Sequence, residues 1–215
     1  MQTEKVYFRL TRFSRFYVVG LLMGVSMYYM LMCQTPLGAE SALTSYDPDR
    51  MPTGFRRNWI TGKRFATVPA EPIRVEVEEG ESGLLLELIT GAIPLMTRRL
   101  ANALTGAGIG NIDFFEAEIH DLETEVVHRS HLAFNLIGAV AAADLGKSVF
   151  QAHDGPMISV DFDSLAIDES KTRGALMFRL AESVNGIVVH DSIKNAVEAA
   201  GIDTLRFLPP PQWVG

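Results

Sequence analysis

The same short pattern occurs twice in this sequence, 93 residues apart, and this repeat constrains the fold more than any other feature. The first copy begins with the apolar stretch Ile93–Thr97 and ends at Gly108. Thr97 is a suitable helix N-cap, and Gly108 can end the helix in the left-handed conformation. The second copy runs in the same way from Ile187 to Gly201. Between these limits, apolar residues at helical spacing are Leu100, Ala103, Leu104 and Ala107 in the first copy and Ile193, Ala196, Val197 and Ala200 in the second.

Identical residues at equivalent positions support the repeat. They are Asn102-Ala103 and Ala107-Gly108-Ile109 in the first copy, and Asn195-Ala196 and Ala200-Gly201-Ile202 in the second. A predicted strand follows each glycine, with Ile112 and Phe114 in one copy and Leu205 and Phe207 in the other. Two strand–helix–Gly–strand units would each bury one helix face against a sheet. The alternative is a chance similarity between two helix-ending sequences.

Other stretches of the chain predict strands that do not alternate regularly with helices. Apolar and polar residues alternate in Ile73–Glu79 and in Phe115–Asp121, and Met157–Phe162 and Ala175–Leu180 predict further short strands. The sequence therefore predicts an α+β fold, a mixed sheet with a few packed helices that include the two similar units. Residues 34–72 have little periodicity and indicate irregular structure. Within them, Arg56-Arg57-Asn58-Trp59 is interpreted as a solvated loop, with a basic partner contact as the alternative.

Charge is distributed unevenly along the chain. Residues 1–65 have a net charge of +5, whereas residues 66–215 have a net charge of −12. Nucleic-acid binding depends largely on Lys and Arg that neutralise phosphates, so the acidic charge of residues 66–215 argues against DNA or RNA as a partner. An acidic region attracts a basic partner, although ordinary solubility explains the same charge.

The N-terminal segment has two interpretations. Residues 16–33 carry no charged side chain and follow Lys5, Arg9, Arg12 and Arg15, a pattern typical of a membrane anchor. The alternative is that Met27–Cys33 is a buried strand and that residues 1–26 are a leader. On either interpretation, residues 1–26 are a leader or the start of an anchor, and residues 27–215 form a single α+β domain.

No residue pattern in this sequence demands catalysis or a cofactor. His128 and His131, with Glu123, Glu125 or His153, are the best candidates for a metal site, but their spacing matches no recognised ligand pattern. The single cysteine, Cys33, excludes an intramolecular disulfide and lies in apolar surroundings that favour an inert thiol. Gly106–Gly110 follows a helix rather than a strand, so it predicts a turn and not a dinucleotide loop.

Several short motifs lie between Ile93 and Pro209, and both their residues and their order along the chain are informative. They are Leu95-Met-Thr97 with Leu100 and Leu104, Asn111–Phe115, Asn135–Gly138 with Asp144-Leu145 and Ser148, Met177–Leu180, and Ala199–Gly201 with Leu205–Phe207 and Pro209. In these motifs the chain resembles a bacterial immunity-protein family found beside polymorphic toxins. Met27-Tyr-Tyr29 is similar to the Tyr-rich start of that family, which favours the strand interpretation of this stretch.

The resemblance implies a non-catalytic inhibitor without a cofactor, which binds and neutralises a cognate toxin in the cytoplasm. A membrane-anchored form through residues 16–33 is the alternative location. Candidate contacts for a basic toxin are Asp113, Glu116, Glu118 and Asp121, which could equally form a solvated sheet face. The motif residues expected to hold the fold together are Thr97, Asn135, Asp144, Ser148, Phe178, Arg179, Gly201, Arg206 and Phe207. A second hypothesis is a membrane-tethered metal-dependent enzyme that uses the histidines and their neighbouring carboxylates.

Overall fold

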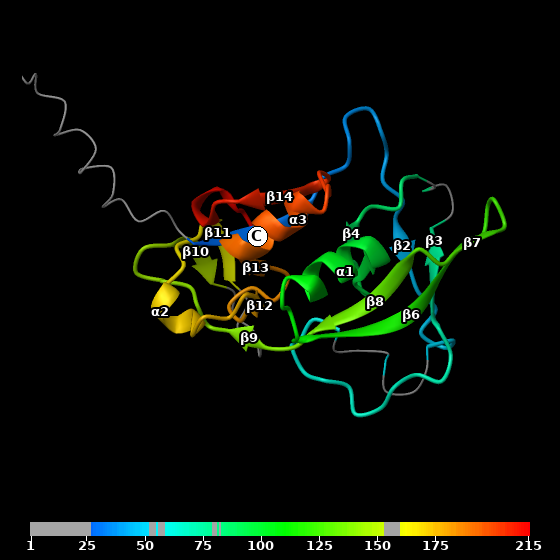
Figure 1. Cartoon of the computed structure of the whole chain (residues 1–215), viewed down its shortest axis with the longest axis horizontal. Coiled ribbons are helices and arrows are strands. Elements are labelled where there is room, and N and C mark those ends of the chain that lie inside the picture. The colour runs from blue at the N-terminus through cyan, green and yellow to red at the C-terminus, as the bar shows by residue number, and fades with distance from the viewer. Residues whose placement is uncertain (1–26, 52–54, 56–58, 79–80, 82, 153–159) are drawn as a thin grey trace, which may run out of the picture.

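The computed structural model describes residues 27–51, 55, 59–78, 81, 83–152 and 160–215 (Figure 1). In these residues, two larger sheets and a two-stranded ribbon combine with three α-helices, so the predicted α+β class is confirmed. Sheet 1 has the order β14 (Leu205–Leu208), β1 (Tyr28–Cys33), β13 (Ile187–His190), β12 (Met177–Leu180), β9 (Ala139–Val140). Sheet 2 has the order β2 (Thr44–Ser45), β3 (Ile73–Val77), β6 (Ile112–Asp121), β8 (His131–Leu136), β5 (Leu95–Thr97), β4 (Leu88–Ile89), and β7 (Val126–His128) also pairs with β6. The remaining elements are α1 (Arg98–Gly106), α2 (Glu169–Thr172), α3 (Asp191–Ala199), the ribbon β10 (Val149–Ala152) and β11 (Val160–Ser164), and the 3₁₀ turn Pro210–Gln212.

The two predicted units are present and have the same topology. In the first unit, β5 leads through α1 into β6, and both strands pair antiparallel with β8 between them. In the second unit, β13 leads through α3 into β14, and both strands pair antiparallel with β1 between them. The next strand outward, β4 in one unit and β12 in the other, is antiparallel in both cases. Each sheet therefore contains the same four-strand arrangement with one helix per unit.

Both helices end in the same hydrogen-bonded cap. The amide of Ile109 donates to the carbonyl of Leu104 at 3.1 Å, and the amide of Ile202 donates to the carbonyl of Val197 at 3.3 Å. Gly108 and Gly201 have φ angles of +91° and +71°, the left-handed conformation that glycine adopts without a steric penalty. This is the Schellman arrangement, which satisfies carbonyls at the helix end.

Each helix also begins with a side-chain cap. The Thr97 hydroxyl accepts a hydrogen bond from the Leu100 amide at 3.2 Å, as the sequence predicts. In the second unit His190 takes this position, and its Nδ1 accepts from the Ser192 amide at 3.2 Å. The capping residue thus differs between the two units, although each helix starts directly after the equivalent strand, β5 or β13.

The second half of the predicted membrane span is a strand. Residues 28–33 form β1, which lies between β14 and β13 in sheet 1, and its side chains Tyr28, Met30 and Leu31 are buried. Within the part of the chain that the structure describes, no helix is long and apolar enough to cross a membrane. Residues 1–26, which include the first half of the predicted span, lie outside the described residues.

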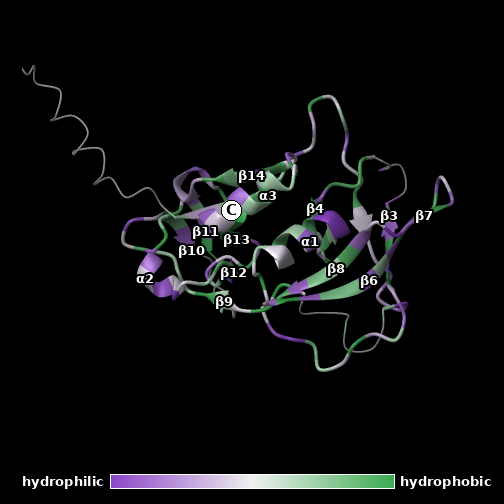
Figure 2. Ribbon diagram, in the orientation of Figure 1, coloured by the Kyte–Doolittle hydropathy of each residue, from purple (hydrophilic) through white to green (hydrophobic). Residues whose placement is uncertain are grey.

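One apolar core joins the two units. It contains Leu100 and Leu104 of α1, Ile193 and Val197 of α3, and residues from both sheets, such as Met96 and Val189. Figure 2 shows the hydrophobic colour along β13 and β14 and the hydrophilic colour over α2. Separate clusters cover the other face of each sheet, with β11 packed on sheet 1.

The irregular segment before β3 contributes large side chains to one of these clusters. Phe55, Trp59 and Phe65 pack around Phe115 of β6, with ring centroids 5.6 Å apart for both Phe55–Phe115 and Trp59–Phe115. The interpretation of Trp59 as part of a solvated loop is therefore wrong, because its ring is buried and its indole N–H donates to the Phe55 carbonyl at 2.8 Å. Residues 56–58 lie outside the described part of the chain.

Candidate functional site

The four acidic residues proposed as toxin contacts all lie on β6, but they do not share one face. Phe115, Ala117 and Ile119 of β6 are buried in the core of sheet 2. Because side chains alternate along a strand, Glu116 and Glu118 lie together on the opposite face. Asp113 and Asp121 have the parity of the buried residues and lie near the two ends of the strand. The structure therefore brings together Glu116 and Glu118 only.

Arginines from neighbouring segments pair with both glutamates. Arg98, the first residue of α1, forms a two-pronged ion pair with Glu116, with Arg98 Nη1 at 3.2 Å from Oε1. Arg129 Nε and Nη2 lie 2.9 and 2.8 Å from Glu118 Oε1, and His120 Nε2 lies 3.2 Å from Oε2. These hydrogen bonds lower the pKa values of Glu116 and Glu118. The face thus presents pairs of opposite charges rather than a purely acidic surface.

The other two carboxylates hold local structure. Asp113 Oδ2 lies 2.9 Å from Arg64 Nε, which ties β6 to the segment before β3. Asp121 Oδ1 accepts hydrogen bonds from the amides of Glu123 and Thr124 at 3.0 and 3.1 Å. These bonds shape the turn between β6 and β7, in which Glu125 has a φ of +58°.

Several of the motif residues lie in the interior. Asn135 of β8 donates from Nδ2 to the Lys63 carbonyl at 2.7 Å, which attaches another residue of the segment before β3 to sheet 2. Phe178 of β12 packs edge-on against Tyr28 of β1, with ring centroids 5.9 Å apart. Arg179 is also buried, and its Nη1 donates to the Val184 carbonyl at 2.9 Å. Burial lowers the pKa of Arg179 to about 10.

The last motif residues lie on β14. Arg206 is exposed, whereas Phe207 is partly buried against the central core. Gly201, just before this strand, occupies the left-handed cap of α3.

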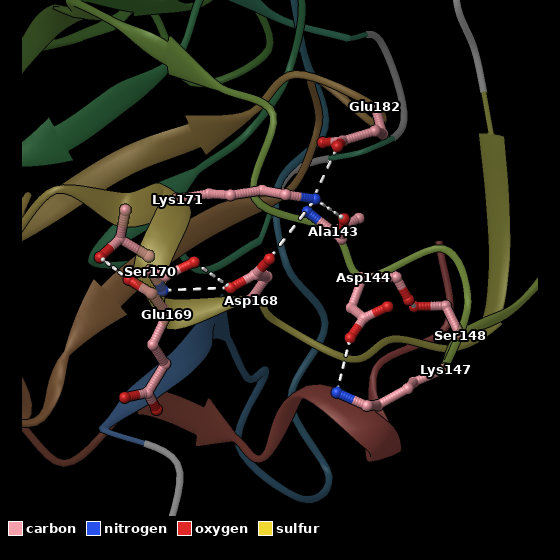
Figure 3. Close-up of polar contacts among 10 residues, drawn as sticks. Ala143, Asp144, Lys147, Ser148, Asp168, Glu169, Ser170, Lys171 and Glu182 are labelled. Atoms are coloured by element: carbon pink, nitrogen blue, oxygen red, sulfur yellow. Dashed lines mark hydrogen bonds and ion pairs between the residues drawn. The ribbon is translucent and has the colours of Figure 1, made fainter.

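The Asp144–Ser148 motif forms a turn that is tied to the chain before α2 (Figure 3). The Asp144 carbonyl accepts hydrogen bonds from the Ser148 amide and hydroxyl at 2.9 and 2.8 Å. The same hydroxyl accepts from the Ala166 amide at 2.9 Å. The carboxylate of Asp144 pairs with Lys147 at 2.8 Å, which lowers the pKa of Asp144.

A second set of polar contacts in Figure 3 connects α2 to the segments that follow β9 and β12. Lys171 of α2 donates to the Ala143 carbonyl at 3.1 Å, and the Ala143 amide donates to Glu182 at 3.2 Å. Burial is the main cause of a raised pKa for Glu182. These contacts join three segments of the chain that follow β11, β9 and β12. Their role is therefore to hold these segments together.

Of the described histidines, His120 and His131 are engaged in contacts within the fold. Both ring nitrogens of His131 are engaged, Nε2 with the Leu86 carbonyl at 2.9 Å and Nδ1 with the Ser130 hydroxyl at 3.0 Å. Burial lowers the pKa of His131, which favours its neutral form. Among the described residues, no three or more His, Cys, Asp or Glu side chains are grouped to hold a metal ion. His153 lies outside those residues.

Cys33, at the end of β1, is half-buried. Its thiol donates a weak hydrogen bond to the Thr204 carbonyl at 3.7 Å. Burial raises the pKa of the thiol, so the reactive thiolate is disfavoured.

Sequence reasoning missed a groove of about 520 Å³ between the two sheets. Its walls come from the end of β1, residues 41–44, residues 86 and 88–91, the β12–β13 turn and the last three residues. No sequence motif marks it because the groove combines short segments from the beginning, the middle and the end of the described chain.

Comparison with known proteins identifies the family. The model of an immunity protein family, Imm11, matches residues 34–210, which are 177 of the 215 residues. No curated protein sequence matches the chain significantly. The matched region contains both strands of the first unit, α3, β14 and every motif residue between Ile93 and Pro209, and the chain belongs to the Imm11 immunity protein family.

Proposed function

We propose that this protein binds one cognate bacterial toxin in the cytoplasm and neutralises it by stoichiometric contact, without catalysis. The observation that carries the proposal is the family match over residues 34–210. An inhibitor of this kind needs a stable scaffold and a complementary surface, and it needs no cofactor. The shared core of the two units provides such a scaffold.

A basic toxin fits the charge of the chain. Residues 66–215 have a net charge of −12, which favours encounter with a positively charged partner. Glu116 and Glu118 are the acidic contacts that share a face, and Arg98 and Arg129 hold their carboxylates in fixed positions. A toxin surface with basic residues at this spacing would extend the existing ion pairs into a network across the interface.

Co-expression with the product of the adjacent gene tests the function. The chain started at Met1 and, separately, at Met27 is expressed with the neighbouring protein, and growth and complex formation are measured. Rescue of growth and a stable one-to-one complex are expected from both forms, since the Met27 start retains β1. Rescue by the Met1 form alone would show that residues 1–26 are required. If the neighbour is toxic by itself and neither form rescues growth or forms a complex, the proposal is wrong.

Charge reversal tests the proposed face. The double substitution Glu116→Lys and Glu118→Lys is compared with Asp163→Lys, which changes an exposed acid on the ribbon strand β11. Weaker toxin binding is expected for the first variant and not for the second. If the wild type binds the toxin and both variants bind it equally tightly, β6 is not part of the interface.

A further inference from the structure

We infer that a groove beside β6 is a subsite for one long cationic side chain, lysine or arginine, of the toxin. We call it the β6 groove, and it is lined by residues 68–72, Arg98, residues 114–116 and Leu132. The inference rests on the proposed function and deepens it, because it names a further acidic contact, Glu71, and the kind of toxin residue that this surface receives.

The β6 groove exists because β3 joins β6 only over the second half of that strand. On one side of β6, residues 112–116 pair with β8, whereas on the other side the pairing with β3 begins at Ala117, opposite Ile73. The segment 68–72, which leads into β3, therefore runs beside β6 outside the sheet (Figure 1). The space between them has a volume of about 360 Å³, which suits a single large side chain.

Apolar side chains form part of the lining of the β6 groove. Phe114 and Leu132 are partly buried, and both pack against the central core that contains α1. Val68, in the segment before β3, is 81% exposed. The methylene groups of lysine or arginine cover apolar surface of this kind, while the charged end of the side chain stays at the rim in contact with water.

The charges at the β6 groove are unbalanced. Its described lining residues include two carboxylates, Glu71 and Glu116, and one guanidinium, Arg98, which leaves a net charge of −1. Arg98 is paired with Glu116, and its Nε also donates to the Arg129 carbonyl at 3.2 Å. The hydrogen bonds from Arg98 lower the pKa of Glu116, so this carboxylate is ionised at neutral pH.

Glu71 supplies the charge that is left over. Its side chain is exposed and has no ion-pair partner among the described residues, so one added cation would balance the groove. An acidic toxin side chain would be repelled here, and an uncharged one would leave Glu71 unpaired. A cation at the end of a long apolar stem matches both the charge and the apolar lining.

Two prolines fix the wall that carries Glu71. Residues 68–72 are Val-Pro-Ala-Glu-Pro, and Pro69 and Pro72 restrict their own φ angles and disfavour the helical conformation of the residue before them. Glu71 directly precedes Pro72 and lies two residues before β3. Its backbone therefore loses little freedom when a partner binds, which reduces the entropic cost of the contact.

Two substitutions in the full chain test the subsite, one by charge and one by shape. Binding of the toxin identified by co-expression is measured by calorimetry at low and high salt. Glu71→Gln should weaken binding by about three- to tenfold at low salt and should make binding less sensitive to salt than in wild type. Ala70→Phe fills the groove from its exposed wall and should weaken binding by about tenfold or more.

Matched controls change the same residue types elsewhere. Glu40→Gln and Ala152→Phe are at exposed positions outside the lining of the β6 groove, and both should bind the toxin as wild type does. All four variants should unfold at temperatures close to wild type, because the native side chains are exposed.

The outcomes separate this inference from the proposed function. Neutralisation by the wild type, together with Glu71→Gln and Ala70→Phe variants that bind within twofold of it, would overturn the subsite and leave the function intact. Unchanged salt dependence in Glu71→Gln, or an equal loss of affinity in Glu40→Gln, would also overturn it, because no specific ion pair would then have been removed. If the wild type does not bind the toxin, both proposals fail. Should Ala70→Phe not fold, Glu71→Gln still decides the question.

Discussion

Substitution of three glycines near the ends of α1 and α3 tests whether the two units share the same helix-capping conformation. Gly106 is the last residue of α1 and Gly108 lies two residues later with a φ of +91°, while Gly201 holds the equivalent place after α3 with a φ of +71°. A Cβ added at any of the three would meet no heavy atom within 4 Å. Alanine therefore changes the backbone energetics at these positions without a clash against other parts of the fold.

The expected effects have opposite signs. Gly106→Ala replaces glycine within the helix and should raise the free energy of unfolding by about 0.5–1 kcal/mol. Gly108→Ala and Gly201→Ala force a side chain into the left-handed region and should each lower it by about 1–2 kcal/mol. The second unit already has alanine, Ala199, at the position equivalent to Gly106.

Urea and thermal unfolding followed by circular dichroism measure these differences. In a chain of this size, 1 kcal/mol corresponds to a shift of roughly 2–4 °C in the unfolding temperature. Gly106→Ala should unfold at a higher temperature than wild type, and the two cap variants should unfold at lower and similar temperatures. A destabilised Gly106→Ala, or a neutral Gly108→Ala, would show that the reasoning about the caps is wrong.

Three further measurements address the caps, the ion pairs and the buried histidine. Thr97→Ala should lower the free energy of unfolding by about 1–2 kcal/mol through loss of the α1 cap, and Thr97→Ser should restore most of it. A double-mutant cycle on Arg98 and Glu116 should give a coupling of no more than about 1 kcal/mol that falls with added salt, because both side chains are exposed. Burial holds the pKa of His131 below its ordinary value of 6.5, so the unfolded chain binds the proton first and stability should fall as the pH drops below about 6.5. His131→Gln should flatten this part of the stability–pH curve, and an unchanged slope would contradict the argument.

The elements that sequence reasoning predicted correctly depend on local signals. The apolar spacing from Leu100 to Ala107, the N-cap at Thr97 and the glycine at Gly108 all act within one helix. The alternation in β3 and β6 similarly reflects which face of each strand is buried. The repeat added longer-range information, since the likeness between the two copies predicted two strand–helix–Gly–strand units, and the structure contains both.

Features that were missed depend on contacts between distant segments. Trp59 lies in a stretch without periodicity, and its burial against Phe115 of β6 cannot be inferred from its neighbours in sequence. The same holds for the candidate toxin contacts, because Arg98 and Arg129 meet Glu116 and Glu118 only after α1, β6 and the turn before β8 have assembled. Sequence alone therefore indicated the acidic strand but not the arginines that pair with it.

The position of β1 links the repeat to the extent of the domain. In the first unit the middle strand, β8, follows β6 along the chain, but the second unit ends at β14 and takes its middle strand from the N-terminal side. β1 lies between β13 and β14, so without it both strands lose a partner and Tyr28, Met30 and Leu31 no longer fill the core. The family match begins at residue 34, directly after this strand. The folded unit is therefore larger than the matched region, and any expressed form of the protein has to begin before Tyr28 to keep the second unit complete.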